Sequence, residues 1–129
     1  MNPTLNTEKK RILVVDDQPA NTRLLKLHLE KTYEVREENN PKAALSAAEA
    51  FRPHLILLDV MMPGVDGGEV ASRIQESPKL KDVPIVFLTA AVTKREVDAG
   101  EGRLGGFPFL AKPVVLSEVT ACIQQHLGE

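Results

Sequence analysis

The stretch His54-Leu55-Ile56-Leu57-Leu58-Asp59 is a short apolar run that ends on a carboxylate. Pro53 breaks the helical pattern before it, so the run indicates a strand buried on both faces. A second run, Ile12-Leu13-Val14-Val15, ends on Asp16-Asp17 in the same way. The ends of two strands therefore bring three carboxylates close together, and this arrangement predicts a cation between them.

Apolar runs and helical stripes alternate along the rest of the chain. Strands that are apolar on both faces and alternate with helices indicate an α/β fold, with a parallel sheet covered on both sides. In such a sheet the working site lies at the carboxyl ends of the strands. The expected strands are 11–15, 33–36, 54–58, 83–88 and 107–110, and the expected helices are 20–31, 42–51, 66–77, 94–99 and 116–127.

Length and composition limit the possible classes of protein. The 129 residues predict one domain, residues 9–129, behind a flexible tail at 1–8. A net charge of −2 argues against direct binding of nucleic acid. The single cysteine, Cys122, cannot form an internal disulfide, which favours a reducing compartment. The polar start and the absence of a long apolar stretch argue against secretion and membrane insertion, so we expect a cytoplasmic protein.

The acidic residues have a second interpretation, because Asp16 or Asp17 could simply cap the helix that begins near Pro19. A cap needs one residue, however, and does not account for Asp59. Three carboxylates about 5 Å apart would repel by about 3 kcal/mol per pair at an effective dielectric of about 20. Oxygen ligands without a nearby His or Cys favour Mg²⁺, or Mn²⁺, over Zn²⁺.

Two further residues end strands on the same side of the predicted sheet. Thr89 ends one strand, where it could also cap a helix, and Lys112 follows another, where it could also be a solvated surface residue. Lys112 precedes Pro113, and their bond is a candidate cis peptide. Together with Asp59 these residues suit phosphoryl chemistry: the carboxylate attacks, the lysine and the cation neutralise charge, and the hydroxyl bonds to the transferred group.

These motifs resemble the receiver domains of two-component response regulators. The matching segments are Val14–Asp17, Asp59–Gly67, Leu88–Ala90 and Phe109–Pro113. The resemblance implies a flavodoxin-like, doubly wound sheet of five parallel strands in the order 2-1-3-4-5, with five helices. It implies a phosphorelay signalling domain rather than an enzyme, in which Asp59 accepts phosphate from a histidine kinase or a histidine phosphotransfer protein.

The resemblance also implies the residue roles at the site. Asp16, Asp17, Asp59 and the backbone carbonyl of Met61 would hold Mg²⁺. Thr89 and Phe109 would form a switch pair that changes the surface read by an unidentified downstream protein. Phe109 has no hydroxyl, so that switch would depend on packing. Four of the eight glycines lie in the segment 100–106, so we expect a short or frayed fourth helix.

The residues also bear on three alternative functions. A phosphatase of the haloacid dehalogenase type would resemble this site but would need a second Asp where Met61 stands. A flavodoxin-like binder would need a hydroxyl- and glycine-rich loop after the first strand to hold a phosphate, whereas Asp16-Asp17 would repel a phosphate. A pseudo-receiver scaffold would have no need of the complete acidic set with Thr89 and Lys112. The three histidines, which have no metal-binding spacing, and Cys122 are interpreted as structural residues.

Overall fold

A six-stranded sheet forms the centre of the computed structural model, which describes residues 9–62, 64–89, 103–104 and 107–128. The strand order is β2-β1-β3-β6-β8-β7. Neighbouring strands are parallel except for β7, which pairs antiparallel with β8. The bounds are β1 Arg11–Val15, β2 Glu34–Glu38, β3 Leu55–Asp59, β6 Ile85–Thr89, β7 Arg103–Leu104 and β8 Phe107–Ala111.

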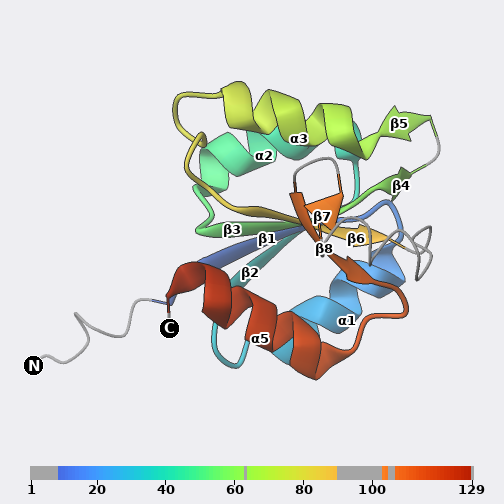
Figure 1. Ribbon diagram of the computed structural model, residues 1–129, viewed down its shortest axis with the longest axis vertical. Helices are drawn as coiled ribbons and strands as arrows, with labels where there is room; N and C mark the ends of the chain where they lie inside the picture. The colour runs from blue at the N-terminus through green and yellow to red at the C-terminus, as the bar shows by residue number, and fades with distance from the viewer. Residues whose placement is uncertain (1–8, 63, 90–102, 105–106, 129) are drawn as a thin grey trace, which may run out of the picture.

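Helices cover both faces of this sheet, with α2 and α3 on one side and α1 and α5 on the other (Figure 1). A short 3-10 turn, η2, leads directly into α2. The bounds are α1 Pro19–Leu29, η2 Pro41–Ala43, α2 Ala44–Phe51, α3 Gly67–Glu76 and α5 Leu116–Leu127.

The apolar sequence of the central strands is uninterrupted because alternate side chains enter two different cores. Leu13 of β1 and Ile56 of β3 pack with α2 and α3, whereas Val14 and Leu57 pack with α1 and α5. Every residue of β3 is buried. Successive side chains of a strand point to opposite faces, so a strand between two helical layers has no solvent-facing side.

The α/β prediction and the parallel sheet of five strands are confirmed, but two details differ. The sheet has a sixth strand, β7, and a separate hairpin joins β4 Met61–Met62 to β5 Val65–Asp66. Strands of two residues are too short for any periodicity to reveal. The described residues contain four α-helices, each at a place where the sequence predicts one. The predicted helix at 94–99 and the predicted tail at 1–8 lie outside the described residues.

Predicted boundaries also shift at the residues that matter most. The predicted strands stop at residues 58 and 88, whereas β3 and β6 each include one residue more, Asp59 and Thr89. The expected helix over 42–51 is divided, because Asn40 accepts a hydrogen bond from the backbone N–H of Lys42 and starts η2 first. Both corrections fall within the one- or two-residue uncertainty of element ends.

The chain turns back sharply after β3, and glycine makes the return possible. Asp66 caps α3 by accepting a hydrogen bond from the backbone N–H of Gly68 at 2.8 Å. Gly67 begins the helix, and a Cβ atom there would lie 2.7 Å from the Cα of Val60. The first turn of α3 can therefore approach the end of β3 only because residue 67 has no side chain.

Gly67→Ala is expected to lower the free energy of unfolding by about 1–3 kcal/mol, because the added methyl must displace backbone. Urea unfolding followed by circular dichroism measures the change. Ser72→Ala is the matched control, since it adds no atoms on an exposed face of the same helix. Equal stability of the Gly67→Ala and Ser72→Ala proteins would show that the approach of α3 to Val60 is not constrained.

Candidate functional site

Three carboxylates converge at the C-terminal ends of β1 and β3. Asp16 and Asp17 follow β1, and Asp59 ends β3, which lies beside β1 in the sheet. One carboxylate oxygen of each lies within 4.8 Å of those of the other two. Asp16 and Asp59 are buried, and Asp17 is partly exposed. The acidic residues that the sequence predicted to meet are thus brought together, in a cluster that could hold a metal ion.

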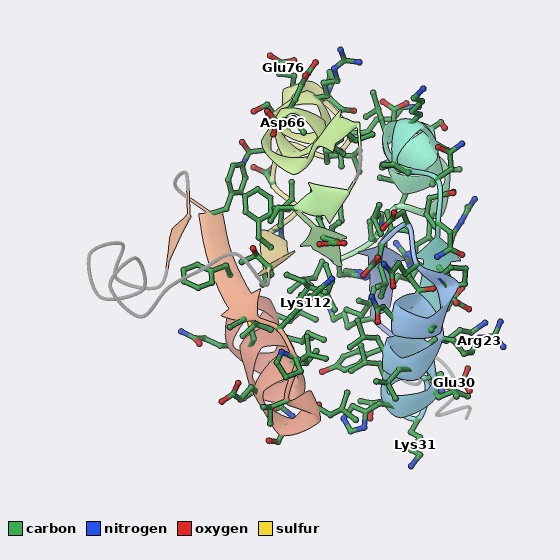
Figure 2. The ribbon with its side chains drawn as sticks, turned by 90° about the vertical axis from the view of Figure 1, so that its right-hand side faces the viewer. Arg23, Glu30, Lys31, Asp66, Glu76 and Lys112 are labelled. Carbon is green, nitrogen blue, oxygen red and sulfur yellow. The ribbon has the colours of Figure 1, made fainter. Side chains whose placement is uncertain are left out.

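Lys112 lies between two of these carboxylates. Its Nζ atom is 3.2 Å from Oδ2 of Asp16 and 3.3 Å from Oδ1 of Asp59. Figure 2 shows this side chain directed inward, whereas the labelled side chains of Arg23 in α1 and of Glu30 and Lys31 just after it point outward. Its backbone N–H donates to the carbonyl oxygen of Thr89 at 2.9 Å, and the predicted cis bond to Pro113 is present. The interpretation of Lys112 as a solvated surface residue is wrong.

The charges at this site fit a divalent cation. Three carboxylates and one ammonium group leave a formal charge of −2. The donors are hard oxygens, and no other group of His, Cys, Asp or Glu with metal-binding proximity is found among the described residues. Hard oxygen donors of this kind suit Mg²⁺ or Mn²⁺ better than a softer metal. The residues present therefore fit the cation that the sequence predicts.

Thr89 and Phe109 lie on neighbouring strands near the cluster. Thr89 ends β6, is completely buried, and stands opposite Ala111 of β8. Phe109 of β8 stands opposite Phe87, which lies two residues before Thr89 in β6. Phe109 packs on the core beneath α2 and α3. Because β6 lies between β3 and β8, Thr89 lies at the sheet edge that carries Asp59, and Phe109 lies two residues before that edge on the next strand.

Asp16 is held at each of its polar atoms. Its Oδ1 accepts from the backbone N–H of Gln18 at 3.0 Å, and its Oδ2 accepts from Nδ2 of Asn21 at 3.1 Å. Its carbonyl oxygen accepts from Nδ2 of Asn39 at 2.8 Å, and its own N–H donates to Glu38 at 3.2 Å. The sequence interpretation missed both asparagines. The only signal for Asn21 is its place in the first turn of a helix that follows Asp16.

The capping alternative for Asp16 is partly correct. Its side chain binds the backbone of Gln18, the residue immediately before α1, but Gln18 itself occupies the N-cap position without a side-chain bond. A single carboxylate can therefore order the turn before the helix and still face Asp17 and Asp59.

A groove of about 160 Å³ opens beside the acidic cluster, between α1 and the segment after β8. Its lining includes Asn21, Leu24 and Lys112. Leu24 is 51% exposed, and Leu27, one turn further along α1, is 55% exposed. A larger groove of about 500 Å³ lies between α2 and α3 and contains none of the candidate site residues. The smaller groove is the one connected to the chemistry.

The remaining titratable candidates have structural roles. His28 bonds to Oγ1 of Thr120 at 3.1 Å and links α1 to α5. Nδ1 of His54 accepts from the backbone N–H of Arg11 at the opposite end of the sheet. Burial raises the pKa of the Cys122 thiol and so disfavours its reactive thiolate form.

The response regulator receiver domain family matches residues 12–124, and the chain belongs to this family. It is thus a receiver domain of the two-component response regulators, which are signalling domains. The chain is 41% identical over 105 residues to the response regulator PleD of Caulobacter vibrioides, covering 81% of the chain and 23% of PleD. It is 30% identical over 122 residues to the polar-differentiation response regulator DivK of Brucella anthropi, covering 93% of the chain and 98% of DivK.

The solved structures show the same architecture. The chemotaxis protein CheY4 of Vibrio cholerae superimposes with a TM-score of 0.78 at 25% identity, covering 91% of this chain and 98% of CheY4. The chain spans less than a quarter of PleD but nearly all of DivK. Among the described residues no helix has the length and apolar character needed to cross a membrane.

Proposed function

We propose that Asp59 accepts a phosphoryl group from a histidine kinase or a histidine phosphotransfer protein, in a reaction that requires Mg²⁺ or Mn²⁺. The observation that carries the proposal is the meeting of Asp16, Asp17 and Asp59 within 4.8 Å, with Lys112 bound to two of them. Asp16, Asp17, Asp59 and the backbone carbonyl of Met61, two residues after Asp59, would hold the cation.

The chemistry is a single displacement at phosphorus. A carboxylate oxygen of Asp59 forms a bond to phosphorus as the bond from phosphorus to the donor histidine nitrogen breaks, and that nitrogen keeps the electron pair. The product is an acyl phosphate. Mg²⁺, when bound, supplies electrostatic stabilisation of the phosphoryl oxygens. Lys112 supplies a second positive charge, because its ammonium group already lies 3.3 Å from Asp59.

Thr89 and Phe109 are proposed to report the phosphorylated state. A phosphoryl group brings up to about −2 of charge, which draws a neighbouring hydroxyl toward it. Thr89 would donate to a phosphoryl oxygen, and Phe109 would fill the space that Thr89 leaves. This movement would alter the surface made by β8 and α5 and so change the affinity for a downstream protein.

The domain is proposed to be a cytoplasmic phosphoacceptor that promotes only its own phosphorylation and dephosphorylation. Met61 occupies the place where a phosphatase of the haloacid dehalogenase type would need its second Asp, which disfavours turnover of other substrates. Intact mass after incubation with Mg²⁺ and acetyl phosphate tests the proposal: the protein is expected to gain one phosphoryl group, and to gain none when EDTA removes the cation. A protein that gains none from acetyl phosphate or any protein donor would contradict it.

A protein donor is proposed to dock on the exposed leucines of α1. Leu24 borders the groove that contains Lys112, and Leu27 extends the same apolar stripe. Leu24→Asp is expected to slow transfer from a phosphorylated histidine protein about tenfold, because burying one leucine contributes about 1.5–3 kcal/mol. The rate with acetyl phosphate should stay unchanged, since a small donor needs no docking face.

The donor for this measurement is the histidine kinase that transfers fastest to the wild-type protein, and transfer is followed with radiolabelled phosphate. Ala50→Asp is the matched control, because it adds the same charge at an exposed position of α2 on the other side of the sheet. Equal slowing in both variants, or equal loss with acetyl phosphate, would show that Leu24 is not part of a docking face.

A further inference from the structure

The amide of Asn21 binds the same carboxylate oxygen that Lys112 binds. Nδ2 of Asn21 lies 3.1 Å from Oδ2 of Asp16, and Nζ of Lys112 lies 3.2 Å from that oxygen. We propose that Asn21 is a positioning residue, which keeps Asp16 correctly oriented toward the cation both in the unphosphorylated protein and after Lys112 turns to the phosphoryl group. The inference rests on the proposed function of Asp59 and assigns a role to a residue outside the receiver motifs.

The need for a second donor follows from the position of Lys112. Its ammonium group is shared between Asp16 and Asp59, at 3.2 and 3.3 Å. A phosphoryl group on Asp59 adds negative charge there and draws the ammonium away from Asp16. Asp16 is completely buried, and a buried carboxylate oxygen that loses its donor is costly. The amide of Asn21 would still be bound to that oxygen.

A neutral donor suits this role better than a charged one. Lysine or arginine at residue 21 would neutralise Asp16 and compete with the cation. An amide instead fixes the direction of the carboxylate and leaves its full charge available. The formal charge of −2 at the cluster is therefore preserved for the divalent ion.

A buried polar network fixes the helical turn that carries Asn21. Nδ2 of Asn39 donates to the carbonyl oxygen of Asp16 at 2.8 Å and to Oγ1 of Thr22 at 3.0 Å. The Thr22 hydroxyl lies 2.9 Å from Oε2 of Glu37 in β2, and Thr22 is completely buried. The residue next to Asn21 is thus tied both to Asp16 and to the neighbouring strand, which explains why a half-buried amide can hold a defined direction.

Asn21→Leu tests the inference, because leucine has a similar volume and no donor. Isothermal titration with Mg²⁺ alone, on the unphosphorylated protein, is expected to show about tenfold weaker binding, as a lost hydrogen bond to a charged group predicts. At saturating Mg²⁺ the rate of phosphorylation by acetyl phosphate should stay within about twofold of wild type. Gln75→Leu removes an exposed amide from α3 and should change neither quantity.

Three results would overturn the inference. Unchanged Mg²⁺ affinity in Asn21→Leu would show that the amide does not position Asp16. A lower rate that saturating Mg²⁺ fails to restore would also overturn it. So would a fall in thermal stability that accounts for the weaker binding, because each points to a structural role.

A wild-type protein that binds no Mg²⁺ and accepts no phosphoryl group would refute the proposed function. In that case the hydrogen bond between Asn21 and Asp16 is tested separately, by the side-chain amide resonance of Asn21 in the ¹H–¹⁵N spectrum of the metal-free protein. That resonance should move in Asp16→Asn, whereas that of Gln75 should not. An unmoved Asn21 resonance would overturn the positioning role independently of any phosphorylation.

Discussion

Asp59→Asn is expected to abolish phosphoryl acceptance, leaving the protein at its unmodified mass after incubation with Mg²⁺ and acetyl phosphate. An amide has the volume of the carboxylate but lacks the nucleophilic oxygen that forms the acyl phosphate. The substitution also removes one negative charge from a cluster of three, so the variant should remain folded. Intact-mass spectrometry of both proteins after identical incubation measures the effect.

Asp66→Asn is the matched control for this experiment. Asp66 is exposed and caps α3, and asparagine is an equally good N-cap residue, so that variant should accept phosphate like the wild type. A phosphoryl group on Asp59→Asn in comparable yield would place the acceptor elsewhere and refute the assignment. Loss of acceptance in Asp66→Asn as well would show that the assay responds to general damage.

The convergence of Asp16, Asp59, Thr89 and Lys112 could be predicted because it depends on topology alone. Each residue ends or follows a strand of a parallel sheet, and the C-terminal ends of parallel strands share one edge. Continuous apolar runs identify those strands without any knowledge of side-chain contacts.

Other contacts could not be predicted, because they depend on orientation rather than on strand ends. Asn39 reaches the carbonyl oxygen of Asp16 from the end of β2, across 23 residues, and asparagine in a loop is common. In the sequence Asn21 is an ordinary helix residue. Only the structure shows that the turn at Gln18 orients the carboxylate of Asp16 toward it. The edge strand β7 is too short to give a pattern.

Lys112→Met is expected to lower the free energy of unfolding by about 1–3 kcal/mol in metal-free buffer. Breaking a fully buried ion pair costs about 3–5 kcal/mol, and the 22% exposure of the Lys112 side chain lets solvent reduce that cost. The variant keeps the apolar stem but leaves three carboxylates without their counter-charge. Phosphorylation by acetyl phosphate should slow by about a hundredfold, the usual effect of removing one preorganised charge from a developing oxyanion.

Added Mg²⁺ should narrow the difference in stability between Lys112→Met and wild type. The cluster in the variant carries a formal charge of −3 instead of −2, so it attracts a divalent cation more strongly. Binding to the folded state alone then raises the free energy of unfolding more in the variant than in wild type. Urea unfolding with and without Mg²⁺ measures both effects, and Lys79→Met, at an exposed site after α3, is the control. If Lys112→Met is as stable as wild type without metal, Lys112 does not balance the charge of the carboxylates. The proposed role of Lys112 in phosphoryl transfer to Asp59 would then also be refuted.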